Sequence, residues 1–169
     1  MCIIIGQTAF FGIRARINPM GKPPITPIAF LAAKLGMCTS IFLLGWKASF
    51  QGPNLPLFAA IPYVALLCGG TLLFVSSFAR LGRSLRIGLP AEETTLVVSG
   101  AYRWSRNPIY LALFCLFGAS LLYAFSWLNL VAVLCAVVFH HRIVLAEEVF
   151  LRRRFKDYET YCEKVPRYF

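Results

Sequence analysis

Residues 108–146 read PIYLALFCLFGASLLYAFSWLNLVAVLCAVVFHHRIVLA, and this stretch decides the fold. No Asp, Glu, Lys or Arg occurs between Arg106 and Arg142. Turn residues near 126–129 divide the stretch into two arms, 108–125 and 129–146, each of about 18 residues and so about 27 Å long as a helix. That length approaches the ~30 Å hydrocarbon core of a bilayer. We therefore expect a helical hairpin in a membrane, with its two ends brought together.

The composition of the whole chain also indicates a membrane protein. Of its 169 residues, 59% are hydrophobic and 14% are charged, whereas soluble domains are about 45–50% apolar. Two more apolar stretches, 28–46 and 55–79, precede the hairpin. We predict an all-α, multi-pass membrane bundle of about four spans. Its predicted parts are an N-terminal interfacial segment (1–27), two transmembrane helices (28–79) and a C-terminal half (80–169) that contains a loop, the hairpin and the tail.

The charges give an orientation and a class of partner. The net charge is +10, from 17 Lys and Arg against 7 Asp and Glu. Because the basic residues flank apolar segments, we expect contacts with lipid headgroups and none with nucleic acid. The positive-inside rule places both termini and the 80–106 loop in the cytoplasm. Lys34, inside the first span, is expected to extend toward the headgroups.

Two further features concern the cysteines and the end of the chain. The six cysteines are scattered without metal-ligand spacing, so we predict neither a metal site nor a disulfide framework. Aromatic and charged residues recur at roughly helical spacing over 147–169, which predicts an amphipathic tail helix.

Polar clusters flank the hairpin on both sides and form the candidate site. Arg103-Trp104-Ser105-Arg106-Asn107 precedes it, and His140-His141-Arg142 and Glu147-Glu148 lie at its other end. Ionisable groups at the edge of a membrane are costly, so their presence suggests a function. Arginine can hold a carboxylate, glutamate can hold an ammonium or ribose hydroxyls, and an aromatic ring can pack on a sulfonium. S-adenosylmethionine carries all of these groups and is the predicted cofactor.

Both clusters also resemble a known family. The run LVVSGAYRWSRNPIY (96–110) resembles the Gly-x-Tyr-Arg-x-x-Arg-His-Pro-x-Tyr signature of the isoprenylcysteine carboxyl methyltransferases, which are related to the membrane phospholipid methyltransferases. Glu147-Glu148-Val149-Phe150-Leu151 resembles the Glu-Glu-x-x-Leu block of the same family, and the residues that follow, Phe155, Tyr158, Tyr161 and Val165-Pro166-Arg167, resemble the family's ending. The resemblance covers about residues 80–169. It implies an S-adenosylmethionine-dependent methyltransferase whose cofactor lies on the cytoplasmic side.

The resemblance also implies roles for individual residues. Cofactor contacts are implied for Leu96, Val97, Tyr102, Asn107, Pro108, Ile109, Tyr110 and Glu147, and Arg106 and Glu148 complete the expected cofactor site. A basic residue near the glutamates is implied to help bind substrate, and Arg142 and Arg103 are the catalytic candidates. Asn107 stands where many relatives have His. Because Asn donates hydrogen bonds but does not titrate, we expect it to position the cofactor.

The methyl acceptor is expected to be a lipophilic molecule that enters from the bilayer. The resemblance favours the carboxylate of an isoprenylcysteine-like lipid, which needs no base to attack the sulfonium methyl. A phospholipid amine is the alternative, with His140, His141 or Glu148 as base. Two other classes stay open, a sterol reductase-like protein and a non-enzymatic membrane scaffold. Arg103, Arg106 and the tyrosines also suit membrane-edge anchors, and the glutamates suit helix-surface pairs with Arg152.

Overall fold

The structure is a computed structural model that describes residues 24–52, 54–81 and 95–169. The expectations for residues 1–23 and 82–94 lie outside these ranges. All regular structure in the described residues is helical. The helices are α2 (Pro27–Phe50), α3 (Leu57–Leu81), the 3₁₀ turn η2 (Gly100–Arg103), α4 (Pro108–Tyr123), α5 (Trp127–Arg154) and α6 (Tyr158–Lys164).

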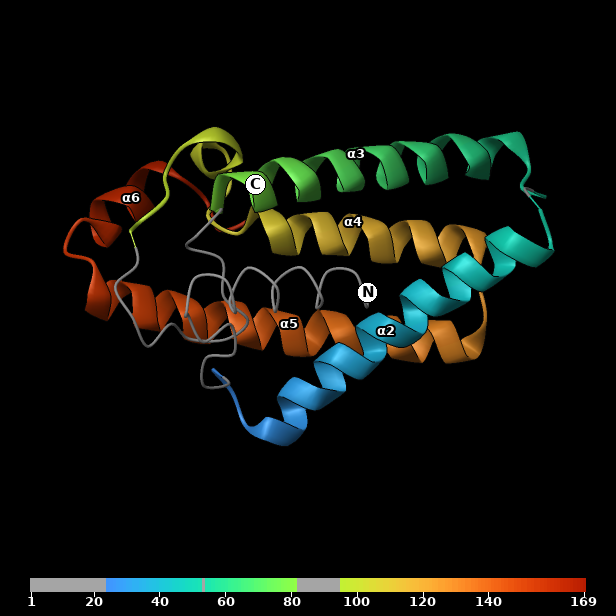
Figure 1. Ribbon diagram of the computed structural model, residues 1–169, viewed down its shortest axis with the longest axis horizontal. Helices are drawn as coiled ribbons and strands as arrows, with labels where there is room; N and C mark the ends of the chain where they lie inside the picture. Colours follow the sequence, from blue (N-terminus) through green and yellow to red (C-terminus); the bar gives the residue numbers. More distant parts are fainter. Residues whose placement is uncertain (1–23, 53, 82–94) are drawn as a thin grey trace, which may run out of the picture.

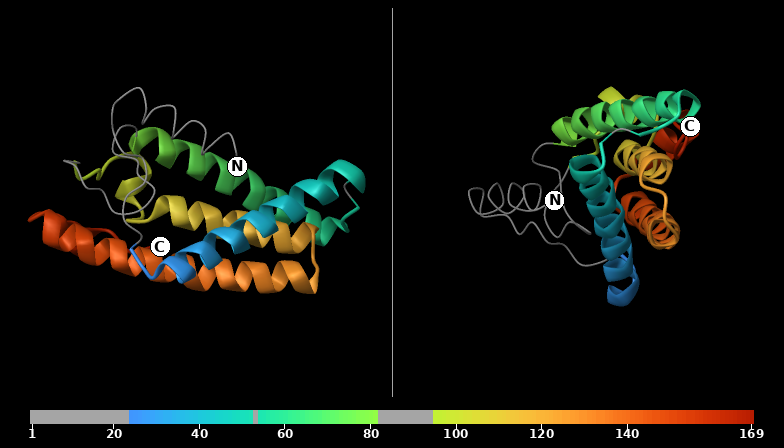
Figure 2. Two further views of the ribbon diagram at one scale, coloured as in Figure 1. Left: turned by 60° about the horizontal axis from the view of Figure 1, so that its bottom comes forward. Right: turned by 90° about the vertical axis from the view of Figure 1, so that its right-hand side faces the viewer.

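The four long helices form two packed pairs. α3 lies along α4, and α2 crosses α5 at an angle (Figure 1). α4 and α5 form the predicted hairpin and join the two pairs, and α2 also contacts α4. Figure 2 shows the same elements from two further sides, with α6 and the C-terminal tail at the end of the bundle where α4 begins. The predicted multi-pass helical bundle is confirmed.

Three of the helices are long and apolar enough to cross a membrane, namely α2, α3 and α5. The fourth predicted span, α4, is a shorter apolar helix of 16 residues, about 24 Å long. α5 has 28 residues and is about 42 Å long, so it extends beyond a ~30 Å hydrocarbon core. The two arms of the hairpin are therefore unequal, and the glutamates lie on the longer arm.

The turn of the hairpin lies slightly earlier than predicted. α4 ends at Tyr123, and Ser126 caps α5, its Oγ accepting from the backbone N–H of Asn129 at 3.1 Å. The Asn129 side chain then donates to the carbonyls of Ser120 and Ala124, at 3.2 and 3.0 Å. A serine cap and carbonyl acceptors at the end of α4 satisfy the polar groups that helix termini leave free. This explains how a polar turn is accommodated between two apolar arms.

The tail differs from the single amphipathic helix predicted over 147–169. α5 continues without a break through both glutamates to Arg154, and the chain becomes extended at Phe155 before α6 begins at Tyr158. Residues 145–154 are mostly good helix formers, so the helix continues where its apolar part ends. As a result the glutamates have the fixed geometry of a long helix, and the last residues fold back across it.

A glycine of α2 sets how closely α2 and α5 pack. A Cβ at Gly36 would lie 2.5 Å from the Ala132 carbonyl oxygen and 3.3 Å from Ala136 Cβ. Small residues allow membrane helices to approach in this way. We predict that Gly36→Ala separates the helices and lowers stability by about 1–3 kcal/mol. Gly45→Ala on the same helix, where a Cβ meets nothing within 4 Å, is the control.

Unfolding in mixed detergent micelles measures the difference. Gly45→Ala is expected to be neutral or slightly stabilising, because alanine favours a helix more than glycine does. Equal stability of the two variants would contradict the close packing at Gly36.

Candidate functional site

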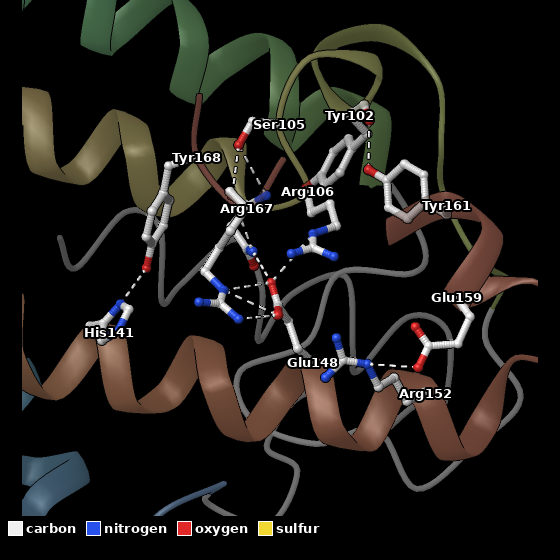
Figure 3. A network of polar contacts seen from close by, with 11 residues as sticks. Tyr102, Ser105, Arg106, His141, Glu148, Arg152, Glu159, Tyr161, Arg167 and Tyr168 are labelled. Carbon is white, nitrogen blue, oxygen red and sulfur yellow. Dashed lines mark hydrogen bonds and ion pairs between the residues drawn. The ribbon is translucent and has the colours of Figure 1, made fainter. Parts of the chain in front are cut away.

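The site lies where the start of α4, the second half of α5 and the C-terminal tail meet. The backbone N–H of Arg106 donates to the Pro166 carbonyl at 3.0 Å. Ser105 Oγ donates to the Arg167 carbonyl at 3.0 Å and accepts from the backbone N–H of Asn107 at 3.2 Å. These bonds hold the residues before α4 against the tail (Figure 3). The hairpin thus brings its two polar flanks together, and the tail closes over them.

Glu148 is the centre of this polar network. Its side chain is 1% exposed, and it accepts from Asn107 Nδ2 at 2.9 Å. Arg167 donates to both carboxylate oxygens, through Nε at 3.2 and 3.1 Å and Nη2 at 3.0 Å. Arg106 Nε lies 3.6 Å from Oε1. Hydrogen bonding to Glu148 raises the pKa of Arg167, which keeps this guanidinium charged. Glu148 therefore links α4, α5 and the tail.

Glu147 has quite different surroundings, although it is the next residue. Both of its carboxylate oxygens lie 3.0 Å from the Tyr110 hydroxyl, which donates to them. Successive residues of an α-helix point about 100° apart. Glu147 shares its face of α5 with His140, seven residues earlier, and Glu148 shares its face with His141. The first face looks toward Tyr110 and the second toward the tail, where Tyr168 lies 2.9 Å from His141 Nδ1.

A second polar group is buried beside Glu147, on the side of α2. His140 is 0% exposed, and its Nδ1 lies 2.7 Å from the Ala136 carbonyl. A carbonyl only accepts, so Nδ1 carries the proton and Nε2 is an acceptor. Lys34 Nζ, 3.4 Å away, donates to Nε2. Lys34 was expected to extend toward the headgroups, but its ammonium instead faces into the bundle.

Aromatic residues of α6 hold the segment before α4 in place. Tyr158, Tyr161 and Val165 form a buried cluster against which Leu96 packs. The Tyr161 hydroxyl donates to the Tyr102 carbonyl at 2.6 Å. Burial raises the pKa of Tyr161 to about 12, so the hydroxyl keeps its proton and remains a donor near neutral pH. The short α6 therefore positions η2, and through η2 the residues from Arg103 to Asn107.

The predicted site residues separate into three groups. Contacts with one another or with the tail bring together Tyr102, Arg106, Asn107, Tyr110, Glu147 and Glu148. Leu96, Val97, Pro108 and Ile109 lie in or beside the same region as buried or half-buried residues. The catalytic candidates Arg103 and Arg142 are exposed, and neither forms a hydrogen bond or ion pair with any residue of the described ranges.

Two charged residues of this region had no site role in the sequence prediction. Arg167 makes the closer ion pair with Glu148. Its place in the family-like ending Val165-Pro166-Arg167 was a signal, but no spacing rule links residue 167 to residue 148. Lys34 does carry a signal, because it lies in the interior of an apolar helix whose other charge, Lys47, is in the last turn, and such interior charges commonly face the interior of a bundle.

Together, the fold and the site define a multi-pass membrane protein with a buried polar centre at one end of a helical hairpin. The family model described as phospholipid methyltransferase matches residues 60–158, which is more than half of the chain. The chain therefore belongs to the phospholipid methyltransferase family, and it is a membrane methyltransferase. No curated protein and no solved structure matches the chain.

Proposed function

We propose that this protein transfers a methyl group from S-adenosylmethionine to a lipophilic acceptor that reaches the site from the bilayer. The observation that carries the proposal is the meeting of Asn107 and Tyr110 with Glu148 and Glu147, in a chain of a methyltransferase family. We also propose that the site and both termini face the cytoplasm, because most basic residues lie in the segments that would be on that side.

The donors and acceptors present suit this cofactor. Arg106 contacts Glu148 through the 3.6 Å ion pair at Nε and makes no side-chain hydrogen bond with any described residue, so its Nη donors are available for the carboxylate of a ligand. Glu147 is half-buried and, among the described residues, accepts only from Tyr110, which leaves lone pairs for an ammonium or for ribose hydroxyls. Glu148 already has protein partners on both oxygens. We therefore assign the direct contact to Glu147, and to Glu148 the task of holding Asn107 and Arg106.

The bound cofactor would supply an electrophilic methyl group on a positively charged sulfur. The chain's own residues would bind, orient and shield the reactants. Tyr110 fixes the rotamer of Glu147, the tail excludes water from Glu148, and the apolar helices keep the acceptor's chain out of water. Orientation and exclusion of water of this kind can supply much of the acceleration of a group transfer.

Two acceptor classes follow from two different observations. The motif from Gly100 to Tyr110 favours the carboxylate of an isoprenylcysteine-like lipid, which would attack without a base. The match to the phospholipid methyltransferase family favours an ethanolamine phospholipid, whose amine must lose a proton. Arg103 and Arg142, both exposed, remain candidates for contacts with an acceptor headgroup.

Binding and turnover of the purified full-length protein test the proposal. S-adenosylhomocysteine is expected to raise the unfolding temperature in detergent. Radiolabelled S-adenosylmethionine is expected to label either N-acetyl-S-farnesylcysteine or dioleoylphosphatidylethanolamine in nanodiscs, and the labelled product identifies the acceptor class. A protein that neither binds S-adenosylhomocysteine nor labels either acceptor would overturn the proposal and favour a scaffold.

A further inference from the structure

Lys34 lies in an unusual place for a membrane lysine. It is on α2, an apolar helix in which the only other charge is Lys47, near the far end. Its Nζ lies 3.4 Å from His140 Nε2 and 5.1 Å from the centre of the Phe30 ring. Holding an ammonium among apolar helices is costly unless it is paired. We therefore expect the Lys34 ammonium to be paired with hydrogen-bond acceptors or a negative charge.

The described residues supply only some of the acceptors that the Lys34 ammonium needs. An ammonium has three donors, and one of them is taken by His140 Nε2. Among the described residues, no carboxylate lies within 4.0 Å of Lys34 Nζ, and Glu147 attracts the ammonium only from a greater distance. The imidazole is fixed as an acceptor by its bond to Ala136, so it orients the ammonium without neutralising it. The remaining donors suit an anionic oxygen from a ligand.

The ammonium is also next to the proposed reaction site. His140 lies on the same face of α5 as Glu147, two helical turns earlier. Tyr110 connects the two, because its ring centre is 6.0 Å from that of His140 and its hydroxyl is 3.0 Å from the Glu147 oxygens. Lys34 thus approaches Glu147 from the side of α2, opposite to Glu148 and the tail.

The position of α2 in the sequence indicates which reactant Lys34 serves. The family match begins at residue 60, so α2 lies outside it, whereas all residues assigned to the cofactor from Leu96 to Glu148 lie inside. We infer that Lys34, oriented by His140, binds an oxyanion of the methyl acceptor, either the phosphate of a phospholipid or the carboxylate of a lipidated cysteine. This inference rests on the proposed function and adds the feature that selects the acceptor.

Substitutions on α2 test the inference in the full-length protein in nanodiscs. Lys34→Met is expected to raise the KM for whichever acceptor the wild type labels by about 10- to 100-fold, the usual effect of losing a hydrogen bond to a charged group. Lys34→Arg keeps the charge and should recover most of that loss. Affinity for S-adenosylhomocysteine should stay within about twofold in both variants, since Lys34 serves the acceptor. Lys47→Met is the matched control, because Lys47 lies over the Tyr123 ring at 5.3 Å, far along the same helix, and its KM should not change.

A binding assay independent of turnover completes the test. Oleyl phosphate and oleyl alcohol have the same chain and differ in charge, and Lys34→Met should weaken binding of the phosphate only. The inference is overturned if the wild type and Lys34→Met bind the phosphate equally well. It is also overturned if the substitution weakens the binding of the phosphate and of the alcohol by the same factor. It is also overturned if S-adenosylhomocysteine affinity falls as much as acceptor affinity, because Lys34 would then serve the cofactor. Failure of the wild type to bind S-adenosylhomocysteine would instead count against the proposed function.

Discussion

Glu148→Ala is expected to destabilise the protein by about 3 kcal/mol, at the lower end of the range for breaking a buried ion pair. The substitution leaves the Arg106 side chain, which is 9% exposed, without its counter-charge, and removes the acceptor of Asn107. Arg167 is 35% exposed and can reach water, which limits the loss. Because Glu148 connects α4, α5 and the tail, the damage should extend to the whole site.

Unfolding in mixed micelles, followed by circular dichroism, measures this loss. Glu159→Ala is the matched control, because its ion pair with Arg152 at 3.2 Å is exposed on both sides and should contribute little. Adding Arg106→Met to Glu148→Ala should restore part of the stability, since the buried unpaired charge is removed. If Glu148→Ala is as stable as Glu159→Ala, Glu148 does not hold the three segments together.

Glu147→Gln is expected to weaken S-adenosylhomocysteine binding by about 10- to 100-fold while the fold stays intact. Glutamine still offers an oxygen to the Tyr110 hydroxyl, so the contact between α4 and α5 persists. It lacks the negative charge that would hold an ammonium or strengthen bonds to ribose hydroxyls. Methyl transfer should fall at least as much as binding.

Calorimetry with S-adenosylhomocysteine measures the loss of binding, and the unfolding midpoint of the same sample shows whether the fold is intact. Tyr110→Phe should weaken binding less, since the carboxylate remains but loses the bond that orients it. We therefore expect different results from substituting the two neighbouring glutamates. The change at Glu147 should lower the affinity for S-adenosylhomocysteine, and the change at Glu148 should lower the stability of the fold. Undiminished affinity in Glu147→Gln would remove Glu147 from the cofactor site.

The meeting of the two polar clusters could be predicted because it depends on local pattern and length. Two apolar arms joined by a short turn must run antiparallel, so the residues around Asn107 and those around Glu147 had to lie at one end. The pairing within the clusters could not be predicted. Asn107 contacts Glu148 and Tyr110 contacts Glu147 because the rotation of α5 about its axis decides which side chain meets which.

The sequence by itself determined the membrane class, the hairpin and the end of the molecule where the candidate site lies, since apolar length and the order of charges act locally along the chain. Only the tertiary structure decided that Arg167 returns to Glu148 and that Lys34 turns inward to His140. The first depends on how the chain folds back after Phe155, and the second on the close approach of α2 to α5 at Gly36. Both bring together residues far apart in the sequence, and packing between helices determines such contacts.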